Sequence, residues 1–246
     1  MTVSSEKVAF ITGANRGIGF ETAKALGALG ITVVLGVRDI AKGEAAAKEL
    51  QALDYQASAI YYDANQATSA NTIFEYLSKH YGKLDILVNN AGILQEPLMG
   101  GNSSSVSADI LQNTFQTNLF AVVTLTQKLL PLMKLAPAGR IVNLSSVLAS
   151  LTLHSMEKSP IDSAKAFAYN ASKTALNAYT VHLAHELRDT NIKVNSAHPG
   201  WVKTKLGGEN APMELKDGGK TSVQLATLDS DGKTGGFFHL GDALPW

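Results

Sequence analysis

The chain has 246 residues, of which 45% are hydrophobic and 17% charged, a balance typical of a soluble globular protein rather than a disordered one. Its 21 basic and 21 acidic side chains cancel, so the charge gives no reason to expect nucleic acid or a membrane as partner. There is no cysteine for disulfide or thiol chemistry and no apolar run long enough to span a bilayer, so we expect a cytoplasmic protein.

Short β-branched runs alternate with longer segments in which apolar residues recur every three or four positions. The runs that predict strands are 7–12, 32–37, 57–62, 84–89, 140–145, 192–197 and a less regular one at 235–240. The segments that predict helices are 19–29, 40–53, 70–81, 107–130, 166–187 and 214–228. Several strands are apolar on both faces, as in a parallel sheet covered by helices on both sides. The pattern predicts one α/β domain over 1–246, a doubly wound Rossmann-type parallel sheet of about seven strands.

Three segments show neither the strand pattern nor the helix pattern and are predicted to be loops: 92–106, 147–165 and 200–213. Each follows the C-terminal end of a predicted strand. An open parallel sheet places its ligand site at this edge. The loops therefore predict a binding crevice at the C-terminal ends of the strands.

A glycine-rich turn, "TGANRGIG" (12–19), joins the first predicted strand to the first helix. Glycines let the backbone turn tightly and approach a pyrophosphate, which the free N–H groups of the helix N-terminus then bind. A tight β–α turn needs glycine in any case, so the strand–turn–helix context carries the argument. The residues that we expect to contact a dinucleotide here are Gly13, Asn15, Arg16, Gly17, Ile18 and Gly19.

The end of the second strand predicts which dinucleotide binds. An acidic residue there would favour NAD by hydrogen-bonding the adenosine ribose, but the chain has Val37 followed by Arg38. A guanidinium suits a phosphate, and Arg16 can reach the same group. Asp39 weakens the argument if its side chain turns inward. We expect NADPH/NADP+ rather than NADH, against the alternative of two solvated arginines.

Two further strand ends carry polar or small residues. Asp63 follows the third strand and can accept a hydrogen bond from the adenine amino group. "NNAG" (89–92) ends the fourth strand, so we expect Asn90, Ala91 and Gly92 to pack against the cofactor and tie strand ends together. Either set alone is also compatible with ordinary turn chemistry.

Six motifs in order make the chain similar to the short-chain dehydrogenase/reductase family over nearly its whole length. They are "TGANRGIG", "NNAG", Asn118, "NLSS" (143–146), "YNASK" (169–173) and "PGWVKT" (199–204). The resemblance implies a Rossmann-type sheet of seven strands. It also implies a catalytic group, which comprises Asn118, Ser146, Tyr169 and Lys173.

The chemistry of these residues agrees with that role. Tyr169 and Lys173 share one face of a helix, and an ammonium close to a phenol lowers the phenol pKa, so we expect Tyr169 to donate a proton near neutral pH. Ser146 would hold the substrate oxygen as a small oxyanion hole. Lys173 would also anchor the nicotinamide ribose. The resemblance implies that Asn118 supports a water molecule that links Lys173 to solvent. Without the other motifs, Asn118 would be interpreted as an ordinary polar surface residue.

"PGWVKT" is expected to hold the nicotinamide end of the cofactor. Pro199 and Gly200 turn the chain after the sixth strand. The resemblance implies that the Val202 backbone binds the carboxamide and that Thr204 bonds the amide or a phosphate. His182 and His185 lie on one helix turn, but no cluster of further ligands accompanies them, so we expect no metal.

Ser146 and Tyr169 lie 23 positions apart, more than in most of the family. Longer insertions here occur in its carbonyl-reductase branch, which the chain also resembles at its C-terminus. The insertion would shape the substrate pocket, block a subunit interface, or both, so a homo-oligomer stays open. Apolar residues dominate the expected pocket rim at 93–98, 148–153 and 201–206.

We therefore expect an NADPH-dependent oxidoreductase that reduces a small ketone or aldehyde, hydrophobic or aromatic, with Tyr169 as proton donor. One alternative is a 3-oxoacyl-thioester (acyl-carrier-protein) reductase, which would need a basic docking surface that the sequence does not concentrate. An NAD-linked alcohol dehydrogenase is disfavoured by Val37 and Arg38. The alternative of another class is a non-catalytic NADP(H)-sensing protein, which would have no need of the complete catalytic group.

Overall fold

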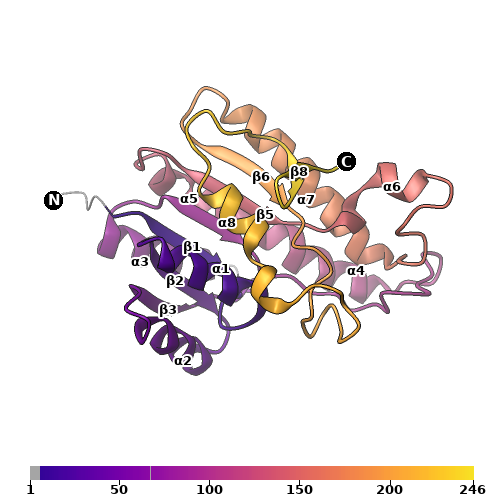
Figure 1. Ribbon diagram of the computed structural model, residues 1–246, viewed down its shortest axis with the longest axis horizontal. Helices are drawn as coiled ribbons and strands as arrows, with labels where there is room; N and C mark the ends of the chain where they lie inside the picture. The colour runs from indigo at the N-terminus through magenta and orange to yellow at the C-terminus, as the bar shows by residue number, and fades with distance from the viewer. Residues whose placement is uncertain (1–5, 67) are drawn as a thin grey trace.

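The computed structural model describes residues 6–66 and 68–246 and contains one sheet in the strand order β3-β2-β1-β4-β5-β6-β7-β8 (Figure 1). Neighbouring strands are parallel except for β7 and β8. The strands are β1 (Val8–Thr12), β2 (Thr32–Val37), β3 (Ala57–Tyr61), β4 (Ile86–Asn89), β5 (Arg140–Leu144), β6 (Lys193–Ala197), β7 (Phe237–His239) and β8 (Asp242–Ala243). The order reverses direction between β1 and β4, as the doubly wound prediction requires.

All seven predicted strands form, and the sheet exceeds the expected number by one strand. The missed strand, β8, has two residues and pairs antiparallel with β7 across a turn at Leu240 and Gly241. Both turn residues have positive φ, of 48° and 96°. A two-residue hairpin with this geometry usually contains Asn-Gly or Asp-Gly, so the Leu-Gly pair gave no recognisable turn signal.

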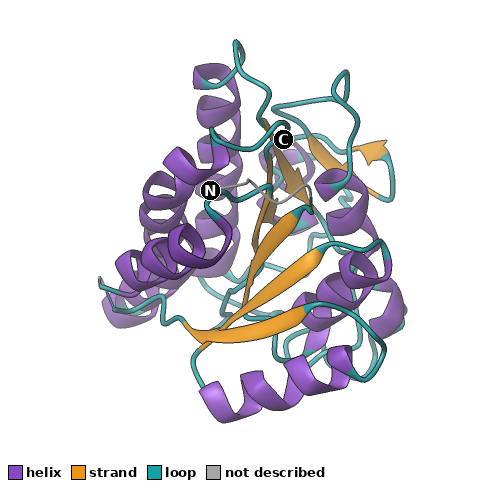
Figure 2. Ribbon diagram, turned by 90° about the vertical axis from the view of Figure 1, so that its left-hand side faces the viewer, coloured by secondary structure: helices purple, strands orange, loops and turns teal. Residues whose placement is uncertain are grey.

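Helices cover both faces of the sheet, as Figure 2 shows. The helices α1 (Gly17–Ala28), α2 (Ile40–Gln51) and α8 (Lys220–Ala226) pack in one core cluster with alternate strand residues such as Ile11. The helices α3 (Ser69–Tyr81), α5 (Ala121–Met133) and α7 (Phe167–Glu186) pack in a second cluster that contains Phe10. Adjacent residues of one strand thus face opposite layers, which explains why the central strands are apolar throughout. Among the described residues, no helix is long and apolar enough to cross a bilayer.

The predicted long helix at 107–130 is interrupted. It forms α4 (Ala108–Phe115), a π-helical turn (Gln116–Phe120) and α5. A π-helical turn inserts one extra residue per turn and often lies at a functional site. Asn118 occupies this turn rather than a regular helix interior.

The segment 147–165 is not all loop, as the sequence led us to expect. It contains a 3-10 turn (Val147–Ala149) and the short helix α6 (Leu151–Ser155). Ser150 caps α6, since its Oγ accepts a hydrogen bond 3.1 Å long from Leu153 N. The other two predicted loops, 92–106 and 200–213, contain no helix, and a single bridge between Val202 and Met213 closes the second.

Candidate active site

A cleft of about 800 Å³ opens at the C-terminal ends of the parallel strands. The predicted site residues that line it are Gly13, Asn15, Arg16, Gly17, Ile18, Gly19, Arg38, Asp63, Asn90, Ala91, Gly92, Ser146, Tyr169, Lys173, Pro199, Gly200, Val202 and Thr204. Of the predicted set, Asn118 alone lies behind the cleft wall. Predicted residues up to 191 positions apart in the chain (from Gly13 to Thr204) thus share one cavity.

The glycine turn has the geometry of an anion cradle. Gly13 and Gly17 have φ of 67° and 63°, which favour glycine. A Cβ on Gly19 would lie 2.5 Å from Asn90 Nδ2 and 2.8 Å from Gly13 O. Only glycine at this position lets α1 approach the turn so closely. A Cβ on Gly17 would meet no protein atom within 4 Å, because this residue faces the cleft. No side chain caps the N-terminus of α1, which therefore suits a phosphate group.

The "NNAG" segment ties β4 to β1. Asn90 Nδ2 donates to Thr12 O at 2.7 Å and to Gly13 O at 3.2 Å. The backbone N–H groups of Asn90 and Ala91 both donate to Thr12 Oγ1, at 3.0 and 2.9 Å. These bonds fix the floor of the cleft beneath the glycine turn, as expected for residues that join neighbouring strand ends.

Three basic residues line the end of the cleft near β1 and β2: the predicted Arg16 and Arg38, and Lys42. The negative charge of Asp39 is compensated by Lys42. It caps α2, with Oδ1 3.2 Å from Lys42 N and Oδ2 2.6 Å from Lys42 Nζ, and these contacts lower the pKa of its carboxyl. Sequence reasoning missed Lys42, although a lysine three residues after a capping aspartate was a usable signal.

Asp63 lies at the same end of the cleft, after β3. Its Oδ1 accepts from Asn65 N at 3.0 Å, and its own N–H donates to Ser69 Oγ at 3.2 Å. The carboxylate is thus held by a turn of its own backbone, which is the ordinary turn chemistry that the sequence left open. The turn also orients Asp63 along the cleft wall.

Tyr169, Lys173 and Ser146 meet at the opposite end. Ser146 follows β5, its Oγ accepts a hydrogen bond from Leu148 N at 3.2 Å, and its hydroxyl is near enough to the Tyr169 phenol to lower the pKa of that phenol in part. Lys173 Nζ donates to Leu144 O at 2.7 Å and lies 5.9 Å from the centre of the Tyr169 ring. All three side chains are buried.

The expected lowering of the phenol pKa by Lys173 is wrong for this structure. Burial raises the pKa of Tyr169 to about 12, and the nearby Ser146 hydroxyl opposes that rise only in part. Burial also lowers the pKa of Lys173 to about 8. The ammonium has turned to the Leu144 carbonyl, so desolvation outweighs its attraction for a phenolate. Tyr169 therefore keeps its proton at neutral pH.

Asn118 is fully buried in the π-helical turn and bonds two segments to each other. Its Oδ1 accepts from Ile93 N at 2.8 Å, while Nδ2 donates to Ile93 O at 2.9 Å and to Ser172 Oγ at 3.0 Å. A Cβ on Gly92 would lie 3.3 Å from Asn118 Oδ1 and 3.4 Å from Lys173 Nζ, so both polar groups border the same point. The role in carrying a water to Lys173 stays a prediction.

The 200–213 loop folds on itself beside the cleft. Gly200 has a φ of 94°, which allows the sharp turn after Pro199. Thr204 Oγ1 accepts from Gly207 N at 2.9 Å and lies 3.3 Å from Val202 O, so its hydroxyl is already engaged within the loop. Trp201 both lines the cleft and closes the loop, because its Nε1 donates to Gly207 O at 2.7 Å.

The insertion between Ser146 and Tyr169 forms the apolar wall of the cleft near Tyr169. Leu148, Ile161, Ala164 and Ala166 form a buried cluster with Tyr169. Pro160, Ile161, Ser163 and Ala164 line the cleft, and sequence reasoning did not identify these four because they lie in an unpatterned segment. The predicted rim at 148–153 contributes Leu148, whereas Leu151 is exposed.

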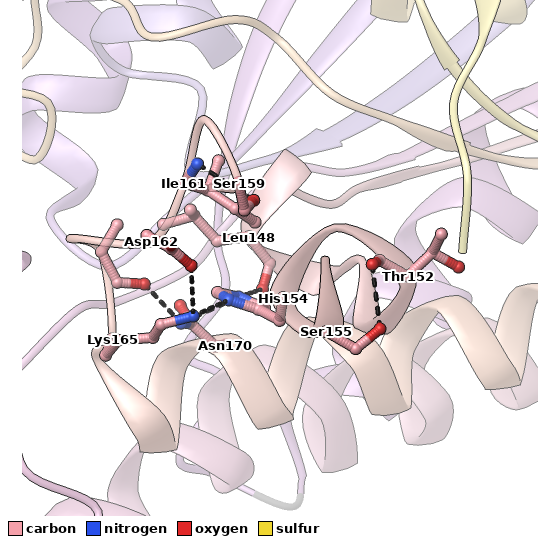
Figure 3. A network of polar contacts seen from close by, with 10 residues as sticks. Leu148, Thr152, His154, Ser155, Ser159, Ile161, Asp162, Lys165 and Asn170 are labelled. Carbon is pink, nitrogen blue, oxygen red and sulfur yellow. Dashed lines mark hydrogen bonds and ion pairs between the residues drawn. The ribbon is translucent and has the colours of Figure 1, made fainter. Parts of the chain in front are cut away.

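His154 holds this wall in place (Figure 3). Its Nε2 lies 3.1 Å from Leu148 O, and its Nδ1 lies 3.0 Å from Lys165 Nζ. Asn170, the residue after Tyr169, donates from Nδ2 to Ala164 O at 2.9 Å. The start and end of the insertion are therefore both fastened to the first turn of α7.

The histidines that we weighed as ligands do not gather. His185 lies 3.0 Å from Arg188 Nη1, and the part of the chain that the structure describes contains no group of three or more His, Cys, Asp or Glu that could hold a metal. His198 accepts a hydrogen bond at Nδ1 from Val147 N, 3.2 Å away. Burial and the neighbouring His239 lower the pKa of His198 to about 3, so its ring is neutral and supports the chain next to Ser146.

Known proteins share both the sequence and the arrangement of these elements. The family model described as short chain dehydrogenase matches residues 7–215. Carbonyl reductase (NADPH) 1 of Mus musculus is 31% identical over 99% of each chain, and carbonyl reductase (NADPH) 3 of Rattus norvegicus is 33% identical over 93% of each. The alignment with the mouse protein spans 281 positions, so that relative has segments that this chain lacks.

Two solved structures superpose closely. The NADPH-bound carbonyl reductase from chicken fatty liver has a TM-score of 0.83 at 26% identity, covering 98% of this chain and 99% of its own. Salutaridine reductase from Papaver somniferum has a TM-score of 0.83 at 27% identity, covering 95% and 99%. The match of the family model to most of the chain and the similarity of the folds agree, and this chain belongs to the short-chain dehydrogenase family.

Proposed function

We propose that this protein reduces the carbonyl group of a ketone or aldehyde to an alcohol with NADPH. One observation carries the proposal: Tyr169, Ser146 and Lys173 converge at one end of a cleft whose other end holds the glycine turn and three basic side chains. Similar proteins named as NADPH carbonyl reductases support the choice of cofactor and reaction. NADPH supplies a hydride when it is bound.

The residues of the cleft fit this cofactor along its length. The N-terminus of α1, which has no capping side chain, would bind the pyrophosphate. Arg16, Arg38 and Lys42 would bind the 2′-phosphate, since Asp39 is neutralised by Lys42. Further along the cleft the residues that would hold the adenine, ribose and carboxamide are Asp63, Asn90, Ala91, Gly92, Lys173, Pro199, Gly200, Val202 and Thr204.

The protein's part in the chemistry is to polarise the carbonyl and to deliver a proton. Ser146 holds the carbonyl oxygen by a hydrogen bond. As the carbon receives the hydride, the Tyr169 phenol gives its proton to that oxygen, so one hydride and one proton complete the alcohol. A phenol whose pKa is about 12 is fully protonated at pH 7, which suits reduction better than oxidation. Lys173 then returns a proton to Tyr169, and Asn118 supports the water that links Lys173 to solvent.

The substrate end favours a small apolar carbonyl compound. Its wall is the cluster of Leu148, Ile161 and Ala164, and Trp201 also lines the cleft. An acyl-carrier protein would need a concentrated basic surface near the opening. Lys165 pairs with Asp162 and Lys203 pairs with Glu214. Lys205 also lines the cleft, but one such side chain is not a concentrated basic surface, so this alternative has less support.

A substrate panel with two tyrosine variants tests the proposal. Aryl ketones, aliphatic ketones and an acetoacetyl thioester would each be tried with NADPH and NADH. Tyr169→Phe is expected to lower kcat for the preferred ketone by roughly 10²–10⁴-fold. Tyr179→Phe, a change of the same kind about three turns further along α7, should leave kcat within a few-fold of wild type. Ketone reduction that survives Tyr169→Phe unchanged would refute the assignment.

A further inference from the structure

Helix α7 begins without a cap of its own. Its N-cap residue, Ala166, has no polar side chain, and no acidic residue lies in the first turn. The missing acceptor comes from the loop after β4, because Glu96 Oε2 accepts a hydrogen bond of 3.1 Å from the backbone N–H of Tyr169. This bond joins residues 73 positions apart at the very residue whose phenol we assign to proton transfer.

The loop that carries Glu96 is fixed on both sides of it. Asn118 holds Ile93 by two hydrogen bonds, and Leu98 packs against the cluster that contains Tyr169. Further along, a Cβ on Gly101 would lie only 2.5 Å from Lys165 O. The loop therefore runs in close contact with the start of α7, and the Glu96 carboxylate is set between two fixed points.

We propose that Glu96 is a positioning residue for the reaction, an inference that rests on the function proposed above. A carboxylate at a helix N-terminus is stabilising, and here it fixes the third amide of the helix. That amide belongs to Tyr169, so the bond fixes where the Tyr169 phenol lies along the helix axis relative to Ser146. Proton transfer to a carbonyl depends strongly on such placement, since a displacement of about 1 Å can cost as much as 10²-fold in rate.

The first turn of α7 is also bonded to a second loop, the insertion, so contacts from two sides fix its position. Asn170, the next residue, donates to Ala164 O of the insertion. Glu96 thus acts on the first turn of α7 from the 92–106 side and Ala164 from the 147–165 side. Loss of the Glu96 bond removes the polar contact from the 92–106 side and leaves the Asn170–Ala164 bond to the insertion unopposed. The cofactor end of the cleft, on α1 and α2, has no part in this arrangement and should bind NADPH as before.

The test compares two variants of Glu96 with a control glutamate outside the cleft. Glu96→Ala removes the acceptor, Glu96→Gln keeps an oxygen that can accept from the Tyr169 amide, and Glu75→Ala makes the same change at an exposed residue of α3. We expect Glu96→Ala to lower kcat for the preferred ketone about tenfold, a loss of about 1.4 kcal/mol in transition-state stabilisation. Glu96→Gln should recover most of it, and Glu75→Ala should match wild type.

Two measurements separate positioning from general loss of structure. The Kd of NADPH should stay within twofold of wild type in Glu96→Ala. The isotope effect on kcat with NADPH deuterated at the transferred position should rise, because a misplaced proton donor slows the chemical step. Gly101→Ala keeps the carboxylate but crowds Lys165 O, and it should reproduce the lower kcat.

The outcomes distinguish this inference from the function on which it rests. If Tyr169→Phe is inactive but Glu96→Ala and Gly101→Ala both keep wild-type kcat, Glu96 is no positioning residue. A parallel loss of kcat and NADPH affinity in Glu96→Ala, without recovery in Glu96→Gln, would overturn it too. If Tyr169→Phe itself retains activity, the proposed function fails first.

Discussion

The two glycines at opposite ends of α1 offer a direct test of the anion cradle. Gly17 begins the helix with a φ of 63°, and Gly30 follows its end with a φ of 76°. A Cβ at either position would meet no protein atom within 4 Å. The open space at Gly17 is the cleft, whereas Gly30 is exposed beyond it. Alanine at the two positions therefore causes the same backbone strain but only one of them obstructs a ligand.

The backbone strain sets the expected loss of stability. A non-glycine residue in the left-handed region costs roughly 1–2 kcal/mol, part of which is offset by the lower entropy of the unfolded chain. A net loss of about 1 kcal/mol lowers the Tm of a protein of this size by about 2–4 °C. Gly17→Ala and Gly30→Ala should both show a decrease in this range without cofactor.

Cofactor binding should separate the two variants. Charge-assisted hydrogen bonds from the α1 amides to a phosphate contribute about 1.5–3 kcal/mol each, so a methyl group that holds the phosphate away should weaken NADPH binding at least tenfold. Fluorescence titration with NADPH, together with the Tm shift that NADPH produces, measures this. If Gly17→Ala binds NADPH as tightly as Gly30→Ala does, the pyrophosphate does not lie on the glycine turn.

Two further predictions concern charge. Lys42→Glu removes a cation from the adenosine end and frees Asp39, so the KM for NADPH should rise about tenfold or more and that for NADH should change little; Lys48→Glu, exposed on the same helix, is the control and should change neither. His198 has a folded-state pKa of about 3, far below the usual 6.5, so it favours the folded state above pH 6.5 and this stability is lost as the pH falls. Between pH 7.5 and pH 5 the loss should be about 2 kcal/mol in urea unfolding, and His198→Asn should reduce it; an equal loss in both proteins would contradict the assignment.

Local sequence was sufficient for the fold and for most of the residues that line the cleft. Short β-branched and apolar runs marked seven of the eight strands, and β1, β2, β4 and β5 are buried throughout. The glycine turn and the Tyr169–Lys173 pair were recognisable because each depends on residues close together in the chain. Their shared cleft followed from the rule that parallel strands end at one edge.

Tertiary structure decided what the sequence could not. The pKa of Tyr169 depends on how deeply the phenol is buried and on where Lys173 Nζ turns, and neither is a property of an i,i+4 pair. Glu96 lies in a loop without periodicity, and its partner is a backbone N–H 73 residues away, which has no signature in the sequence.

The insertion shows how substrate choice and catalysis become linked in this fold. Its wall residues Ile161 and Ala164 pack in the same cluster as Tyr169. The helix α6 that supports the wall is itself held by the far end of the chain, because Trp246 O accepts from Thr152 N at 2.8 Å and from Ser150 Oγ at 3.1 Å. In Figure 1 the C-terminus lies on the α6 side of the domain.

A side chain in this wall therefore has two effects at once. Under the proposed function, it shapes the space for the carbonyl substrate and supports the ring that we assign to proton transfer. Trp201 and Leu206 line the same cleft but have no part in the cluster around Tyr169. Under the proposed function, selection for a new substrate can thus act through Trp201 and Leu206 with less effect on kcat than through Ile161 or Ala164, where any gain in fit also alters the packing of the assigned proton donor.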